Sequence, residues 1–189
     1  MMEPVPWLFE KLSKSVERKH IDGDRVQLVN SALAQSGDPE SKSGTKTFYR
    51  VDLEMLKEKK QIQSPMWDRM GSFLRSHIVK SLMAHAKMSH EEAEQFVQET
   101  EVNVQTAEDI LGGYGLSAHS IDVFVVDTEG YDFIVIKEFL GRFPEFRPRL
   151  VIYESRHLSQ DDKDLATQFM RNMGYFTIPT GMNELCIKI

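Results

Sequence analysis

Two acidic residues stand directly after the most apolar segment of the chain. Residues 121–126 (IDVFVV) predict a strand buried on both faces, and Asp127, Thr128, Glu129 and Gly130 follow it. A carboxylate at the end of a buried strand is costly unless it is paired or hydrogen-bonded. Asp127 is therefore a functional acid, a cap for the helix that follows, or both. Glu129 also suits the first turn of that helix, because the helix dipole favours an acid there.

Other polar residues follow strands or precede helices in the same way. Glu154 comes directly after a second apolar strand at 150–153, Asn30 follows a strand candidate within 25–33, and Glu3 precedes the first helix. In open α/β sheets, ligands bind beyond the carboxyl ends of the strands. These positions are thus the candidates for a ligand site.

The elements that must position these acids alternate along the chain. Apolar spacing, capping residues and β-branched runs predict helices over 6–16, 106–113, 131–140 and 159–172, and strands over 25–33, 45–51, 102–104, 121–126, 150–153, 175–179 and 184–189. Alternation of this kind is typical of an α/β fold with a mostly parallel sheet, here closed by an antiparallel pair of strands at its C-terminal end.

Residues 53–100 differ from the rest and indicate a helical insertion in a single domain of residues 1–189. Apolar residues recur here at helical spacing, a pattern typical of core packing. Ser89 and Glu92 form a capping box, which predicts a helix running to about Gln98.

Composition excludes several classes of function. The chain has 189 residues, 29 acidic against 23 basic, and a formal charge of -6, which argues against binding to nucleic acid. No apolar run reaches the length of a membrane span. The N-terminus lacks the pattern of a signal peptide, and Cys186 is the only cysteine, so we expect a cytoplasmic protein.

Two other signals carry little weight. The six histidines show no metal-ligand spacing, and no metal site is predicted. Residues 113–118 (GYGLSA) match a glycine-rich phosphate pattern, but they follow a helix and precede a strand, the reverse of the order that this pattern requires.

Several segments together resemble one known family. Residues 120–132 (SIDVFVVDTEGYD) resemble the IDLLKIDVEGYE signature of FkbM-type methyltransferases, and residues 102–111 (VNVQTAEDIL) resemble its V.V.TLDDLL lead-in. Weaker likenesses lie at 2–12, 29–33, 47–49 and 150–154. The resemblance implies a Rossmann-like class I fold and an S-adenosylmethionine-dependent enzyme that methylates hydroxyl groups.

On the cofactor side, the resemblance implies that Glu3 holds the ribose of S-adenosylmethionine. Asn30, Ser31 and Ala32 would lie near the adenine. Asp127 would lie beside the methionine end and the methyl group that is transferred.

On the acceptor side, the resemblance implies that Glu129 and Glu154 face the substrate. A general base helps to methylate a hydroxyl, and Asp127 or Glu129 could serve as the catalytic base. Glu154 is the substrate-binding candidate. The expected acceptor is a hydroxyl of a small molecule or glycan.

Two departures from the family pattern leave alternatives open. The lysine before the DxEG segment is Val125 here, and the family's first strand and glycine loop have no counterpart in the chain. One expectation is an N-terminally truncated methyltransferase that is inactive as written. Another is a degenerate, non-catalytic binding module that a partner strand or a second copy completes. A third is an unrelated α/β domain.

Overall fold

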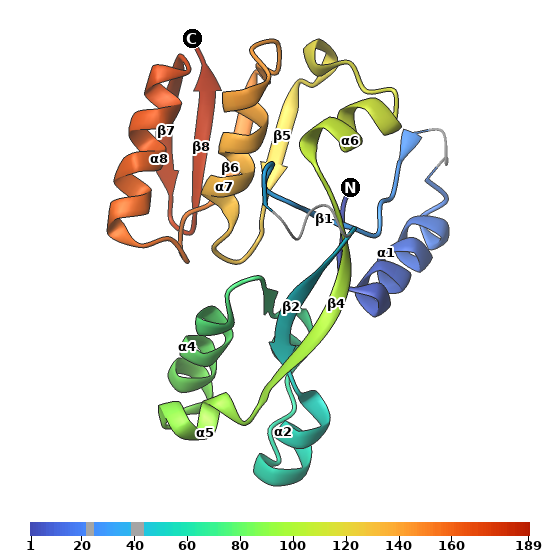
Figure 1. The fold of residues 1–189 in the computed structure, drawn as a ribbon, viewed down its shortest axis with the longest axis vertical. Coiled ribbons are helices and arrows are strands. Elements are labelled where there is room, and N and C mark those ends of the chain that lie inside the picture. Colours follow the sequence, from blue (N-terminus) through green and yellow to red (C-terminus); the bar gives the residue numbers. More distant parts are fainter. Residues whose placement is uncertain (22–24, 39–43) are drawn as a thin grey trace. The chain divides into compact units, whose positions relative to one another are not determined.

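The computed structural model describes residues 1–21, 25–38 and 44–189 as two compact units, Met1–Thr106 and Ala107–Ile189. Both are mixed α/β units, and the described strands form two four-stranded sheets, one in each unit (Figure 1). Each unit is treated separately below. The prediction that residues 1–189 make a single methyltransferase domain stays a prediction.

The sheet of the first unit has the order β1-β4-β2-β3. Its main feature is a long antiparallel pair, β2 (Thr45–Val51) with β4 (Val97–Gln105), in which Thr45 lies opposite Asn103 and Val51 opposite Val97. Strand β1 (Ala32–Leu33) adds to β4 in parallel, and β3 (Gly71–Ser72) adds to β2 in antiparallel orientation.

Helix α1 (Pro6–Arg18) begins as the sequence predicts, with Pro6 in its first turn. Buried residues beside it form one of the unit's cores, with Trp7, Leu8 and Phe73 packed against its edge. The buried members are Val5, Ala32, Ala34, Phe48, Val102 and Val104.

The helical segment that follows β2 has a core of its own. It contains α2 (Leu53–Lys60), α3 (Pro65–Arg69), α4 (Arg75–Ala86) and α5 (His90–Glu94), which lie around the far ends of β2 and β4 (Figure 1). Its buried residues include most of the apolar positions at helical spacing: Leu56, Trp67, Met70, Ile78, Val79, Leu82, Met88, Ala93 and Phe96. The predicted role of this stripe in core packing is confirmed for Trp67, Met70, Ile78 and Leu82, whereas Met66 and Leu74 are exposed.

Two predicted elements in this unit were wrong in extent. The Ser89 cap starts α5, since its hydroxyl accepts the Glu92 N–H at 3.2 Å, but the helix ends at Glu94 and β4 begins at Val97. Residues 100–104 (TEVNV) alternate threonine and valine with polar residues, and this alternation suits a strand paired with β2. The predicted strand over 25–33 is reduced to β1 and one parallel bridge, Met2 with Val29.

The sheet of the second unit has the order β5-β6-β8-β7. Strand β5 (Val123–Val126) pairs in parallel with β6 (Leu150–Glu154). Strand β8 (Asn183–Lys188) lies between β6 and β7 (Tyr175–Thr180), antiparallel to both. The predicted C-terminal antiparallel pair is confirmed. The prediction of a mostly parallel sheet was wrong. Strand β8 pairs with both β6 and β7 in antiparallel orientation, so only the β5–β6 pair of this sheet is parallel.

Helices connect these strands on the predicted pattern. Helix α6 (Ala107–Gly113) opens the unit and a 3₁₀ turn η3 (Ala118–Ser120) precedes β5. Helix α7 (Asp132–Ile136) continues into the π-helix η4 (Lys137–Gly141) before β6. Helix α8 (Gln160–Asn172) starts at the Ser159 cap, whose hydroxyl accepts the Asp162 N–H at 3.1 Å.

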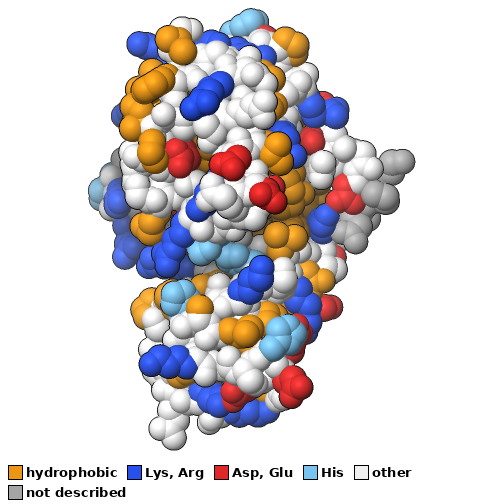
Figure 2. Space-filling view, turned by 90° about the vertical axis from the view of Figure 1, so that its left-hand side faces the viewer, with side chains coloured by type: hydrophobic (Ala, Val, Ile, Leu, Met, Phe, Trp, Pro, Cys, Tyr) orange, Lys and Arg blue, Asp and Glu red, His pale blue; other side chains and the backbone are white. Residues whose placement is uncertain are grey.

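One face of this sheet is buried and the other is exposed. The predicted burial of β5 on both faces was wrong, because Val123 is 53% and Val125 is 62% exposed. Across the sheet, Val123 lies in register with apolar residues of β6, β8 and β7. Two of these, Ile187 and Phe176, are also exposed. Hydrophobic side chains are visible near the top of Figure 2, at the height of α8, β7 and β8 in Figure 1. None of the helices in the described part of the chain has the length and apolar character of a membrane span.

Candidate active site

Three of the predicted acids meet at the ends of β5 and β6 in the second unit. Asp127 and Glu129 follow β5, and Glu154 ends β6. The two strands are parallel and paired, so their carboxyl ends lie together. One carboxylate oxygen from each acid lies within 4.8 Å of the others, a spacing that a divalent cation could also use.

His157 joins this cluster, although the spacing of the histidines did not predict it. Its Nε2 lies 3.3 Å from Glu129 Oε2 and 3.7 Å from Glu154 Oε2. The signal that could have identified it is its position three residues after Glu154, which brings it back to the end of the strand. A histidine among three acids supplies the group that can balance their charge once it is protonated.

Asp132 holds the loop that carries Asp127 and Glu129. Its side chain is fully buried. Oδ2 accepts the Thr128 hydroxyl at 3.0 Å and the Gly130 N–H at 3.2 Å. Oδ1 accepts the Glu154 N–H at 3.2 Å, so one carboxylate ties the loop after β5 to the end of β6.

The loop turns sharply at two residues with positive φ. Glu129 has φ of 52° and Gly130 has φ of 98°. Gly130 confirms the predicted tight turn, since glycine adopts this conformation without a steric cost. Glu129 is strained there, and strained residues of this kind cluster at functional sites.

The alternative that Asp127 caps the next helix finds no support in the structure. Helix α7 starts after Tyr131 and has no side-chain hydrogen bond at its cap. Burial and the neighbouring Glu129 raise the pKa of Asp127, and His157 lowers it.

Glu154 is the most perturbed acid of the cluster. Burial, followed by the charges of Glu129 and Asp127, raises its pKa to about 7. Its side chain is only 13% exposed, and Oε2 has no hydrogen-bond partner among the described residues. At neutral pH this carboxyl therefore exchanges a proton readily, as a general base must.

The remaining predicted residues lie in the first unit. Glu3 Oε1 accepts the Val5 N–H at 2.8 Å, and burial raises the pKa of this carboxyl. The Asn30 amide donates to the Glu3 carbonyl at 2.9 Å and to the Pro4 carbonyl at 3.2 Å. These bonds replace strand pairing after Val29, which is the physical reason for the shortened strand there.

Ser31 and Ala32 are buried beside β4. The Ser31 hydroxyl donates to the Asn103 carbonyl at 3.1 Å and lies 3.2 Å from the Ala32 carbonyl. Both side chains thus contribute to the packing of β1, and their predicted place near an adenine stays a prediction. The glycine-rich pattern at 113–118 follows α6, as the sequence indicated.

These features define a mixed α/β chain with an acidic cluster at adjacent strand ends. The model of the methyltransferase FkbM domain matches residues 2–177, so the chain belongs to the FkbM methyltransferase family. No curated protein and no solved structure shows a significant match to the chain.

Proposed function

We propose that the protein is an S-adenosylmethionine-dependent methyltransferase that acts on a hydroxyl group of a small molecule or glycan. The observation that best supports this proposal is the cluster of Asp127, Glu129, Glu154 and His157 at the ends of β5 and β6, in a chain of the FkbM family. Bound S-adenosylmethionine would supply a methyl group activated by its sulfonium.

On the cofactor side, Glu3 suits a ribose. Its Oε1 is held by Val5, and Oε2 has no hydrogen bond in the described residues. Asn30 fixes the backbone on which Glu3 stands. A carboxylate held in this way can accept hydrogen bonds from vicinal hydroxyls. Asp127 remains the acid proposed beside the methyl group.

On the acceptor side, Glu154 is the best-matched base. A pKa of about 7 lets it accept the proton of the hydroxyl as the methyl group is transferred. Glu129 is also proposed for catalysis. It lies beside His157, and its charge helps to keep the pKa of Glu154 raised.

The test is methyl transfer by the native protein. The gene would be tagged at its 3′ end in its own host. The purified protein would be incubated with S-adenosylmethionine and a metabolite extract of that host. Formation of S-adenosylhomocysteine is then measured by mass spectrometry.

We expect product with the wild type and a loss of about 10²-fold or more in Glu154→Gln, the usual range for a lost general base. Glu145→Gln changes an exposed acid outside the cluster and should retain the activity. The absence of product above background with the wild type, or full activity in Glu154→Gln, contradicts the proposal.

A second candidate function is a non-catalytic binding module completed by a partner strand or a second copy. It is favoured by β5, which lies at the edge of its sheet and exposes Val123 and Val125. The mass of the purified native protein separates the two candidates: a stable, monodisperse monomer that produces S-adenosylhomocysteine excludes this one.

A further inference from the structure

His157 faces two acids of the cluster from the turn after β6. Its Nε2 lies 3.3 Å from Glu129 Oε2 and 3.7 Å from Glu154 Oε2. A ring nitrogen so close to a carboxylate carries its hydrogen, because a lone pair at this point would be repelled by the oxygen. Nε2–H can therefore be donated to Glu129 whether the ring is neutral or protonated.

The turn that carries His157 is held on both sides. The Met182 carbonyl, at the tip of the β7–β8 hairpin, accepts the N–H groups of Ser155 at 2.9 Å and Arg156 at 3.1 Å. On the other side, Leu158 is buried, and its N–H donates to the Ser155 carbonyl at 3.2 Å. The imidazole is thus presented to the acids by a backbone that is fixed before and after it.

The side chain of Glu129 is less constrained than the loop on which it stands. Asp132 holds that loop through Thr128 and Gly130, but the Glu129 side chain is 30% exposed. When Glu129 and Glu154 are both ionised, their charges repel each other and drive the more exposed of the two toward water. A donor between the two carboxylates opposes this movement.

The position of Glu129 matters for the proposed base, Glu154. After burial, the charge of Glu129 is the largest influence that raises the pKa of Glu154 to about 7. The effect of a charge that turned into solvent would be screened. Holding Glu129 in place therefore keeps Glu154 able to accept a proton near neutral pH.

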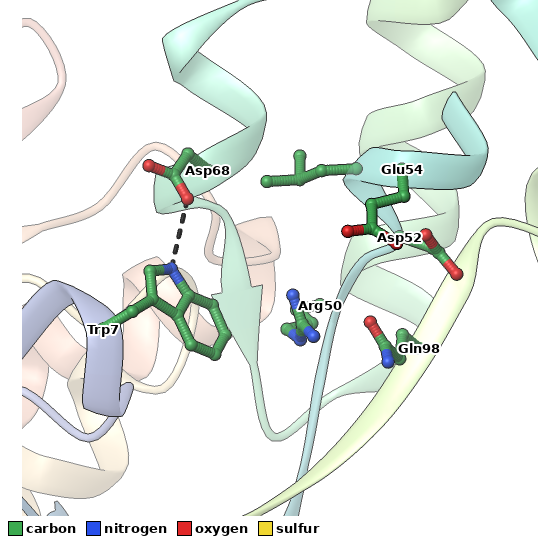
Figure 3. A pocket seen from close by; sticks show the side chains of 7 residues that line it. Trp7, Arg50, Asp52, Glu54, Asp68 and Gln98 are labelled. Carbon is green, nitrogen blue, oxygen red and sulfur yellow. Dashed lines mark hydrogen bonds between the residues drawn. The ribbon is translucent and has the colours of Figure 1, made fainter. Parts of the chain in front are cut away.

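A ring N–H fixes a carboxylate in the same way in the first unit. Trp7 Nε1 donates to Asp68 Oδ1 at 3.1 Å in the wall of a pocket (Figure 3). The other oxygen of Asp68 pairs with Lys11. At the ends of β5 and β6, the ring that faces the carboxylates is the imidazole of His157.

We infer, on the basis of the proposed function, that His157 is a positioning residue whose Nε2–H holds the Glu129 carboxylate beside Glu154. In the proposed reaction, the acceptor hydroxyl gives its proton to a Glu154 oxygen as its own oxygen takes the methyl group. The electron pair of the broken carbon–sulfur bond stays on sulfur. His157 forms and breaks no bond in this step and acts through the two acids.

The experiment compares His157→Gln with His157→Asn in the native protein, with S-adenosylmethionine and the metabolite extract of the host. The amide nitrogen of glutamine reaches the position of Nε2, whereas that of asparagine reaches only the position of Nδ1. We expect His157→Asn to lower kcat about tenfold or more with an unchanged KM for S-adenosylmethionine, and His157→Gln to stay within about threefold of the wild type. His119→Asn changes an exposed histidine in η3, before β5, and should retain the activity.

The outcomes separate this inference from the proposed function. Full activity in His157→Asn, equal losses in both variants, or a raised KM in place of a lowered kcat overturns the positioning role and leaves the methyltransferase intact. The absence of S-adenosylhomocysteine with the wild type overturns both. Circular dichroism checks that each variant is folded.

A second measurement does not depend on activity. Long-range ¹H–¹⁵N NMR of the wild type reports which nitrogen of each imidazole carries a hydrogen, and the signal missing from His157→Gln assigns His157. We expect Nε2 to carry a hydrogen at neutral pH. A His157 ring protonated at Nδ1 alone could donate nothing to Glu129 and would overturn the inference.

Discussion

The buried carboxylate of Asp132 accepts the backbone N–H of Glu154 at 3.2 Å. The same side chain accepts the Gly130 N–H and the Thr128 hydroxyl. A residue that faces no solvent thereby sets the distance between two acids of the candidate site, Glu129 in the loop and Glu154 at the strand end. The geometry of the cluster depends on a group outside it.

Replacing this carboxylate should destabilise the protein. Whichever way the amide of Asp132→Asn is turned, its NH₂ group faces a donor, either the Glu154 N–H or the pair formed by Thr128 and Gly130. We expect a loss of about 1–3 kcal/mol in the free energy of unfolding, measured by urea denaturation. Asp122→Asn, an exposed change in the same unit, is the control. Equal stabilities of the two variants would show that the three bonds contribute nothing.

Glu154 should make stability depend on pH. Its pKa is 4.5 in a model peptide and about 7 in the folded protein. A raised folded pKa means that the protonated form is favoured by folding. The stabilisation is therefore fully present below pH 4.5 and is lost as pH rises through about 7.

Solvent screening limits the size of this contribution to about 1–2 kcal/mol between mildly acidic and alkaline pH. Thermal unfolding of Glu154→Gln across that range should show a smaller decline in stability than the wild type. Glu145→Gln should follow the wild type. A wild-type decline that persists undiminished in Glu154→Gln would assign it to another group.

The sequence predicted the acids of the site better than the groups that hold them. Asp127, Glu129 and Glu154 could be found because each follows an apolar strand, and parallel pairing of those strands brings their ends together. His157 had one signal in the sequence, its position three residues after Glu154. Asp132 had none, since its role depends on how the chain turns after β5. The burial of Val123 and Val125 was overestimated because apolarity indicates that a strand can be covered, without saying what covers it.

The single cysteine gives a test of the core of the second unit. Cys186 is fully buried, and burial raises the pKa of its thiol to about 11. Because the thiolate is the reactive form, we expect native protein at neutral pH to resist a thiol reagent such as Ellman's reagent, and urea-unfolded protein to react completely. N-acetylcysteine gives the reference rate. Labelling of the native protein at that rate would mean that β8 is not covered.

The turn at Gly130 should tolerate no side chain. Its φ of 98° is one that residues with a Cβ rarely adopt, and its N–H must stay aligned with Asp132. Gly130→Ala should therefore cost roughly 1–3 kcal/mol of stability.

Gly112→Ala is the matched control, because Gly112 lies in α6 with no atom within 4 Å of an added Cβ. There the change should be neutral or stabilising, since alanine favours helices more than glycine does. Urea denaturation of both variants measures the difference, and a Gly130→Ala variant as stable as Gly112→Ala would contradict the strained turn.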